Sequence, residues 1–303
     1  MRIVVTGGAG FLGRHVVSKL KADGHFVFVP RSKEYNLQTP DGIRRALFGD
    51  PEVVIHLAAA VGGIGANQAH PARFLYENIL MGAMLMEASR LAEVDKFVTI
   101  GTACEYPADA PLPLREDDIW NGYPAPETAP YGIAKRTLLA QGQAYRREYG
   151  MDVIHLIPTN LYGEGDGFNP ETSHVVPALI RKFVAARDEK TPTVTCWGSG
   201  TATREFLYVA DAAAAIVSAT ANYGGAEPVN IGTGVETPLS ELAELIAKLV
   251  GYEGRIEWDS TRPEGTSRRW MDVSRAYAGF GFRATTTLED GLRRTIDWYE
   301  AAT

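Results

Sequence analysis

The residues with the clearest chemical potential are a tyrosine and a lysine in the run Tyr131-Gly132-Ile133-Ala134-Lys135. Their spacing of four places both side chains on one face of a helix. An ammonium beside a phenol favours the phenolate, so we expect Lys135 to lower the pKa of Tyr131 toward neutrality. Such a pair suits proton transfer to or from a sugar or alcohol oxygen while a nicotinamide carries a hydride. The pair therefore predicts a redox enzyme.

A glycine-rich run near the N-terminus, Gly7-Gly8-Ala9-Gly10-Phe11-Leu12-Gly13, supplies a matching cofactor signal. It follows a strand-like segment and opens a helical one, the context in which such a motif binds a dinucleotide. Gly7 permits the tight turn, Gly10 lets a pyrophosphate approach the backbone, and Gly13 lets the helix pack on the sheet. The pyrophosphate would sit at the N-terminus of the following helix, where free N–H groups favour negative charge, and Phe11 and Leu12 are further expected cofactor contacts.

The end of the second predicted strand, Phe26–Pro30, bears on the choice between NAD and NADP. An NAD site usually has a carboxylate there for the ribose hydroxyls. This chain has Arg31, Ser32 and Lys33, and no acid before Glu34. Cations and a hydroxyl suit a 2′-phosphate, which favours NADP(H). A solvated basic turn with no cofactor preference is the alternative.

Strand-like and helical segments alternate through about the first 165 residues. The predicted strands are Ile3–Thr6, Phe26–Pro30, Val53–Leu57, Phe97–Gly101 and Val153–Pro158. The predicted helices are Leu12–Ala22, Gly42–Leu47, Phe74–Leu91 and Tyr131–Tyr149. This alternation predicts an α/β fold with a doubly wound parallel (Rossmann) sheet in residues 1–165. Each motif falls at the carboxyl end of a strand, where such sheets bind ligands.

The pattern changes after Gly163, where residues 164–174 read as a loop rich in Gly, Asp, Asn and Pro. The elements predicted beyond it are helices at Val175–Ala186 and Ala210–Ala221, a strand pair at Val194–Trp197 and Glu205–Val209, a strand at Val229–Gly232, a capped helix after Thr237, a strand at Arg255–Trp258 and an amphipathic helix ending near Glu300. We expect residues 166–303 to form a smaller C-terminal substrate lobe, with segments near 203–235 returning to the NADP-binding domain.

Composition argues against several classes of protein. A net charge of -7 without a block of Lys or Arg is unlike a nucleic-acid-binding surface. Two cysteines, Cys104 and Cys196, imply no disulfide framework and fit a reducing compartment. No apolar stretch approaches the roughly 20 residues of a membrane helix, and no signal peptide precedes the first strand. We expect a cytoplasmic protein, and one without a metal site because no His/Cys/Asp cluster has ligand spacing.

Six further strings have the form of a known family's motifs. They are Ala58-Ala59-Ala60-Val61-Gly62-Gly63-Ile64, Pro158-Thr159-Asn160-Leu161-Tyr162-Gly163, Ser173-His174-Val175-Val176-Pro177-Ala178-Leu179, Trp197-Gly198-Ser199-Gly200, Arg204-Glu205-Phe206 and Arg262-Pro263-Glu264-Gly265-Thr266. Over essentially its whole length the chain resembles the extended short-chain dehydrogenase/reductase family and, within it, the GDP-L-fucose synthase group. The GDP-mannose 3,5-epimerases are related but less similar. The resemblance implies an NADPH-dependent epimerase-reductase that converts a GDP-linked 4-keto-6-deoxy sugar to GDP-L-fucose or a close relative.

The resemblance also implies catalytic roles. Thr102, where the family usually has Ser, would help polarise the sugar 4-keto group. Tyr131 would protonate the oxygen at carbon 4, and Lys135 would hold the nicotinamide ribose. Cys104 and His174 would be the base and acid that epimerise carbons 3 and 5, whose protons are acidified by the adjacent carbonyl.

The binding residues implied by the resemblance occupy the remaining motif positions. Lys182, Arg204 and Arg262 would bind the substrate diphosphate, which explains how an acidic protein takes an anionic substrate. The other expected substrate contacts are Asn160, His174 and Trp197. The other expected cofactor contacts are Ala58, Pro158, Asn160 and Leu161.

The helices Phe74–Leu91 and Tyr131–Tyr149 carry more apolar residues than one face needs. In the family such helices pair across a two-fold axis as a four-helix bundle. We therefore expect a homodimer, the alternative being that both helices simply cover the sheet.

The chain departs from the family pattern near the expected substrate. The family's Ser-Ser-Cys-Ile-Tyr-Pro is here Thr102-Ala103-Cys104-Glu105-Tyr106-Pro107, which loses one hydroxyl and gains a carboxylate. Lys182 replaces a more common Arg, and the segment Trp120–Ala129 is unlike the family's. Because we expect these changes around the substrate, another deoxysugar or a heptose on a nucleoside diphosphate stays open.

Three other functions compete with this one. An epimerase with tightly bound NAD would close its second strand with an acid, and a plain 4-ketoreductase would not need Cys104 or His174. A catalytically silent dinucleotide sensor would need the glycine run but not Tyr131 and Lys135. We expect the remaining cysteine and histidines to be structural or solvated: Cys196, His15, His25, His56, His70 and His155.

Overall fold

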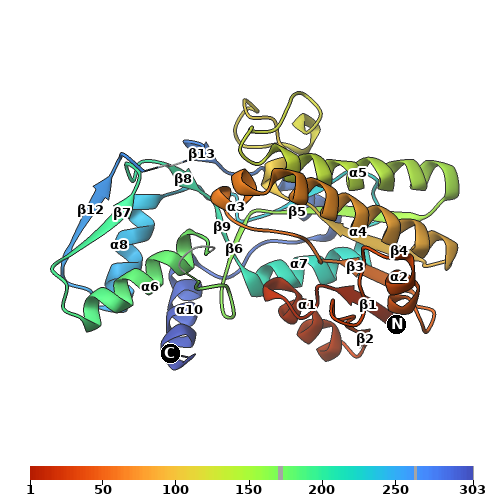
Figure 1. The fold of residues 1–303 in the computed structure, drawn as a ribbon, viewed down its shortest axis with the longest axis horizontal. Helices are drawn as coiled ribbons and strands as arrows, with labels where there is room; N and C mark the ends of the chain where they lie inside the picture. Colours follow the sequence, from red (N-terminus) through yellow and green to blue (C-terminus); the bar gives the residue numbers. More distant parts are fainter. Residues whose placement is uncertain (170–172, 263–264, 303) are drawn as a thin grey trace.

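A six-stranded parallel sheet forms the centre of the larger part of the molecule (Figure 1). The computed structural model describes residues 1–169, 173–262 and 265–302. The strand order β10-β5-β4-β3-β1-β2 confirms the predicted doubly wound fold. The strands are β1 Arg2–Thr6, β2 Phe26–Phe28, β3 Val53–His56, β4 Lys96–Ile100, β5 Asp152–Pro158 and β10 Val229–Ile231.

Helices cover both faces of this sheet because successive side chains of each buried strand point to opposite layers. Ile3 and Val5 of β1 pack in one core with residues of α1 and α7, whereas Val4 packs in another with residues of α2 and α4. Figure 1 shows α4 and α5 over one face and α1 and α7 over the other. The helices of this part are α1 Phe11–Ala22, α2 Pro40–Ala46, α3 Ile64–Ala69, α4 Pro71–Leu91, α5 Ala129–Tyr149, α7 Val209–Asn222 and α9 Ser274–Phe280.

A smaller region is built around a second apolar core, seen at the left of Figure 1. Buried residues of α6, α8 and α10 meet there, among them Phe183, Ile246 and Ile296. Its helices are α6 Val175–Asp188, α8 Leu239–Val250 and α10 Leu288–Ala302. The remaining strands are β6 Asn160–Tyr162, β7 Thr193–Trp197, β8 Thr203–Arg204, β9 Phe206–Tyr208, β11 Thr237–Pro238, β12 Arg255–Asp259 and β13 Arg268–Arg269. Two short 3-10 helices, η1 Ala103–Glu105 and η2 Glu116–Asp118, follow β4.

Two local predictions for the second half were wrong. The strands near Val194–Trp197 and Glu205–Val209 do not pair: β7 pairs with β12, and β9 pairs with β6, each in parallel. These partners are distant in sequence, so local patterns carried no signal for them. The helix after Thr237 begins beyond Pro238 and has no side-chain capping hydrogen bond.

The loops that follow strands β1 to β5 all emerge at one edge of the main sheet. Because β1, β2, β3, β4 and β5 run parallel, the residues that follow them emerge side by side. The glycine turn, Arg31, Ala58, Thr102 and Pro158 therefore lie along the same edge of the sheet. Within the described ranges, no helix is both long and apolar enough to cross a membrane.

Candidate active site

The glycine turn after β1 has the geometry of a dinucleotide cradle. Gly7 has φ of +70°, a conformation that glycine adopts without strain, and a Cβ there would stand 2.6 Å from the Ala58 nitrogen. A Cβ on Gly13 would overlap the Gly7 carbonyl, so α1 approaches the turn only because Gly13 lacks a side chain. Gly10 is the N-cap of α1 and has no capping side chain, which leaves the helix N-terminus open to an anion. These residues fit the pyrophosphate of a dinucleotide.

The other expected cofactor contacts surround this turn. Phe11 and Leu12 lie in the first turn of α1, and Ala58 lies two residues beyond the end of β3. Pro158 ends β5 and Leu161 lies in β6. Arg31 and Ser32 follow β2 with exposed side chains, so both can reach a phosphate in solvent. No acidic residue intervenes between β2 and Ser32.

Tyr131 and Lys135 lie on the first turns of α5, as their spacing predicted. The Lys135 ammonium is 5.8 Å from the centre of the Tyr131 ring. Lys135 is only 2% exposed, whereas Tyr131 is partly exposed. The tyrosine ring packs edge-on against Phe74 of α4, with ring centres 6.3 Å apart. The helix pair α4 and α5 therefore fixes the phenol at the sheet edge.

The electrostatic setting of this pair differs from the prediction. Loss of water around the Tyr131 ring raises the pKa of the phenol above its ordinary value, and the nearby charges of Cys104 and Glu105 add to this effect. Burial lowers the pKa of Lys135 to about 8, while Glu105 acts in the opposite direction. The expectation that the pKa of Tyr131 is lowered toward neutrality was wrong for the protein alone, because burial raises it. Tyr131 therefore stands in this structure as a phenol, the form that donates a proton.

Thr102 and Cys104 lie beside this pair in the turn after β4. Thr102 is the N-cap of η1, and its hydroxyl oxygen accepts the Cys104 N–H at 3.3 Å. A hydroxyl that accepts in this way keeps its own O–H for donation. The Cys104 carbonyl packs so closely on Gly132 that a Cβ there would overlap it. Because Cys104 also influences the pKa of Tyr131, the thiol and the phenol belong to one site.

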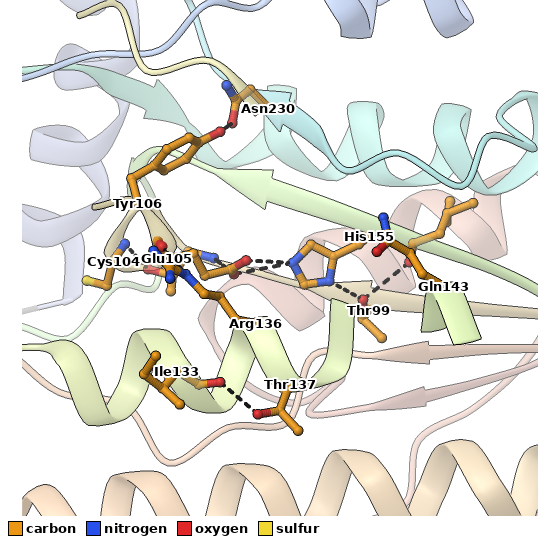
Figure 2. Close-up of polar contacts among 12 residues, drawn as sticks. Thr99, Cys104, Glu105, Tyr106, Ile133, Arg136, Thr137, Gln143, His155 and Asn230 are labelled. Atoms are coloured by element: carbon orange, nitrogen blue, oxygen red, sulfur yellow. Dashed lines mark hydrogen bonds and ion pairs between the residues drawn. The ribbon is translucent and has the colours of Figure 1, made fainter. Parts of the chain in front are cut away.

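Glu105 does not face the substrate, contrary to the expectation from sequence. Glu105 is the last residue of η1 and is 0% exposed. Its buried carboxylate accepts the Thr102 N–H at 2.7 Å. Its other neighbour is the imidazole of His155 in β5, with Nε2 at 3.1 Å from Oε2 (Figure 2). His155 was expected to be structural or solvated. The Thr-x-x-Glu spacing of residues 102–105 is that of a capping box, and it was the signal that could have shown that Glu105 turns toward the Thr102 backbone.

His174 lies at the N-cap of α6 with an exposed side chain. Asp166, in the loop after β6, is a titratable group within electrostatic range of His174. Burial raises the pKa of Asp166, and the charge of His174 opposes that effect. Asp166 was missed by sequence reasoning, since nothing local marks it as a partner of His174.

The expected substrate cations gather around an exposed indole in the smaller region. Trp197 is 59% exposed, and the charged groups of Lys182 and Arg262 lie 5.8 and 5.4 Å from its ring centre. Lys182 also donates to the Thr195 carbonyl at 3.0 Å, and Arg262 lies 3.5 Å from the Asp259 carboxylate. Two positive charges on an aromatic face make a surface suited to a nucleotide base and its phosphates.

Arg204 and Asn160 lie where the two parts of the molecule join. Arg204 ends β8 and is partly buried. The side-chain amide of Asn160 donates to the Glu205 carbonyl at 2.9 Å, and the Thr159 hydroxyl donates to the same oxygen at 3.3 Å. Parts of the Arg262–Thr266 motif, Pro263 and Glu264, lie outside the described residues.

The sequence model of the NAD dependent epimerase/dehydratase family matches residues 3–232, which hold the glycine turn, Tyr131, Lys135 and Cys104. The chain belongs to this family. The family places a dinucleotide at the glycine turn, in agreement with the geometry above.

Individual relatives show a closer likeness. The chain is 40% identical to GDP-L-fucose synthase 1 of Arabidopsis thaliana over 300 residues, which is 98% of this chain and 93% of that protein. A GDP-L-fucose synthetase from Naegleria fowleri bound to NADP superposes with a TM-score of 0.89 at 26% identity, covering 99% and 94% of the two chains. A GDP-6-OMe-4-keto-L-xylo-heptose reductase from Campylobacter jejuni superposes with a TM-score of 0.93 at 27% identity, covering 100% and 98%.

Proposed function

We propose that this protein is an NADPH-dependent epimerase-reductase that converts a GDP-linked 4-keto-6-deoxy sugar to GDP-L-fucose or a close relative. The observation that carries the proposal is the 40% identity to a GDP-L-fucose synthase over nearly the full lengths of both chains. The NADP bound by the Naegleria fowleri relative supports the choice of cofactor. The grouping of Tyr131, Lys135, Thr102 and Cys104 at one sheet edge supports the reaction type.

The reduction uses the phenol and the hydroxyl at the end of β4. The bound nicotinamide supplies the hydride. Thr102 donates a hydrogen bond to the 4-keto oxygen and so polarises the carbonyl. Tyr131 donates its proton to the same oxygen as negative charge develops there. Lys135 binds the ribose hydroxyls of the cofactor, and its ammonium stabilises the phenolate that remains on Tyr131.

The epimerisation uses groups on opposite parts of the molecule. Cys104 follows β4 of the main sheet, and His174 begins α6 of the smaller region. A substrate held between these parts presents the carbons beside its carbonyl to the thiol and the imidazole. One group removes a proton from the carbon and the other donates its own proton to the opposite face, while Tyr131 and Thr102 stabilise the enolate oxygen.

The nucleotide end of the substrate is assigned to the surface around Trp197. The indole stacks on the base, and Lys182, Arg204 and Arg262 neutralise the diphosphate. Asn160, at the junction of the two parts, contacts the sugar or the cofactor.

The choice of NADPH is assigned to the turn after β2. Removing the guanidinium in Arg31→Ala is expected to raise KM for NADPH about tenfold or more, because a charge-assisted hydrogen bond to the 2′-phosphate is lost. KM for NADH should not change, because NADH has no such phosphate. Lys21→Ala removes an exposed cation at the far end of α1 and serves as the control. Equal effects of Arg31→Ala on the two cofactors would contradict the assignment.

The proposed partner chain is a second copy, docked on α4 and α5. These helices and α2 border an apolar groove lined by Leu47, Met84, Ala88 and Leu91. Leu91 is 67% exposed in the single chain, so the substitution Leu91→Glu should not disturb its own fold. In a four-helix interface the introduced carboxylate would be buried, which would weaken the free energy of association. We therefore expect light scattering to show the wild type as a dimer and the variant as a monomer. Val235→Glu, at an equally exposed apolar position in the other part, should stay dimeric.

A second candidate is a GDP-sugar 4-ketoreductase without epimerase activity. The likeness to the Campylobacter jejuni heptose reductase favours it. The exposed aromatic residues Trp120 and Tyr123, in the segment that precedes Tyr131, are where a different sugar would be recognised.

The first test of the proposal is substrate-dependent oxidation of the reduced cofactor. Incubation with GDP-4-keto-6-deoxy-mannose should consume NADPH and leave NADH largely unused. Consumption with a 4-keto heptose linked to GDP, and none with the deoxyhexose, would favour the second candidate. Oxidation of neither cofactor with either sugar would contradict both.

A further inference from the structure

A row of buried polar side chains crosses the main sheet directly beneath the candidate site. Thr6, His56, Thr99 and His155 are register partners on the neighbouring strands β1, β3, β4 and β5. Each is at most 3% exposed. The Thr6 hydroxyl lies 2.8 Å from Nδ1 of His56, and the Thr99 hydroxyl lies 2.5 Å from Nδ1 of His155. Burying polar groups this deeply costs free energy unless they form hydrogen bonds, as these side chains do with one another.

Glu105 ends this row at the side of the active site (Figure 2). With its proton on Nε2, His155 donates to the carboxylate at 3.1 and 3.2 Å, and the Thr99 hydroxyl donates to Nδ1. Oε1 of the same carboxylate also accepts the Thr102 N–H. The carboxylate is thus fixed from the core by β5 and in turn fixes the first peptide of η1.

This arrangement connects Glu105 to Thr102, expected at the keto oxygen, and to Cys104, expected at the ring carbons. The same turn holds the Thr102 hydroxyl against the Cys104 N–H, so a shift of Glu105 displaces both residues. Arg136 of α5 adds a second tie, since its Nε donates to the Glu105 carbonyl at 2.5 Å and its Nη1 donates to the Gly122 carbonyl at 2.8 Å.

Glu105 is also a buried charge that acts on its neighbours from below. Burial lowers the pKa values of Lys135 and Arg136, and the charge of Glu105 opposes that effect in both; it also adds to the raised pKa of Tyr131. The titratable groups that face this region are His155 from β5, His56 from β3, Cys104 from η1, and Tyr131, Lys135 and Arg136 from α5. His56 is held neutral by burial, with its pKa lowered to about 3. Glu105 is therefore an anion that favours the ammonium form of the buried Lys135.

We propose that Glu105 is a positioning residue of the proton-transfer site: its carboxylate, held by His155, fixes the turn of Thr102 and Cys104 and is the counter-charge of Lys135. The inference rests on the proposed function for the role of Lys135 in holding the cofactor ribose. The inference gives a function to Glu105, which occupies a position where the GDP-L-fucose synthase group has an aliphatic side chain. Glu105 itself touches neither substrate nor cofactor.

The test is the pH dependence of NADPH binding, measured by fluorescence in the full-length protein without any sugar. In the wild type, binding should weaken as the pH rises past about 8, where Lys135 loses its proton. Glu105→Gln keeps an acceptor for the Thr102 N–H but removes the charge. We expect it to move this transition to lower pH by about one unit, because an ammonium without its anion releases its proton more readily. The alkaline limb of kcat/KM for reduction should move in the same direction.

The matched control is Glu116→Gln. Glu116 is also a buried carboxylate, 6% exposed, that accepts a backbone N–H, that of Asn230 at 2.9 Å. Its charged neighbours are Arg275 and Asp272 rather than Lys135, so the transition should stay at the wild-type pH. Glu105→Asp restores the charge on a shorter side chain and should return the transition close to that of the wild type.

Three outcomes would overturn the proposal. The first is a folded Glu105→Gln variant whose NADPH-binding transition stays at the wild-type pH. The second is a shift in Glu116→Gln equal to that in Glu105→Gln. The third applies if Glu105→Gln does not fold, and is a transition in Glu105→Asp that differs from that of the wild type. A lowered thermal midpoint without a pH shift would show a merely structural carboxylate. Absence of turnover by the wild type would contradict the proposed substrate instead, since the binding transition needs no sugar.

Discussion

Tyr131→Phe is expected to lower kcat for NADPH-dependent reduction by about 10³-fold, the range typical of a lost general acid. The substitution removes one hydroxyl and keeps the ring that packs against Phe74. The fold and the cofactor cradle should therefore be preserved, and NADPH should bind as tightly as to the wild type. Steady-state kinetics at saturating substrate measure the effect, because KM changes would otherwise obscure the chemical step.

The structure gives this prediction a direction in pH as well. Because burial keeps Tyr131 protonated, the wild-type reductase should hold its activity through neutral pH and lose it only on the alkaline side. The residual rate of Tyr131→Phe should lack any limb that depends on the phenol. Activity of Tyr131→Phe within a few-fold of the wild type would remove Tyr131 from the mechanism and leave Thr102 as the donor at the keto oxygen.

Cys104→Ala is expected to abolish proton exchange at the sugar carbons, with a loss of about 10²- to 10⁴-fold in epimerisation. A methyl group cannot accept a proton, and the small change should be tolerated in a partly exposed turn. Reduction of a substrate that needs no epimerisation should proceed at nearly the wild-type rate. Deuterium incorporation from heavy water, followed by mass spectrometry and NMR, separates the two activities.

The second cysteine provides the matched control for this prediction. Cys196 lies in β7 and is 1% exposed, and burial raises the pKa of its thiol. Cys196→Ala should leave exchange unchanged. Exchange that persists in Cys104→Ala would assign epimerisation to His174 alone or to a group outside the turn after β4.

Local sequence patterns predicted most of what positions the site. A glycine turn between a strand and a helix needs only adjacent residues, and so do the Tyr131/Lys135 spacing and the alternation of β and α segments. What the sequence could not predict depends on long-range neighbours. The pairing of β7 with β12 joins residues about 60 positions apart, and Glu105 is explained by His155, 50 residues later.

The pKa of Tyr131 shows the same limit in a different way. The spacing correctly placed Lys135 near the phenol, but the balance of effects depended on burial of the whole site and on the charges of Cys104 and Glu105. Desolvation of a group is a property of the packed molecule, so a pair of residues in a sequence indicates only one of the competing contributions.

The most direct measurement of the central proposal is a single incubation with NADPH and GDP-4-keto-6-deoxy-mannose in heavy water. We expect NADPH to be consumed and the product to carry deuterium at carbons 3 and 5, which an epimerase-reductase alone produces. Consumption without deuterium would establish a plain ketoreductase and contradict the roles of Cys104 and His174. Deuterium in the sugar without loss of NADPH would contradict the reductase role of Tyr131.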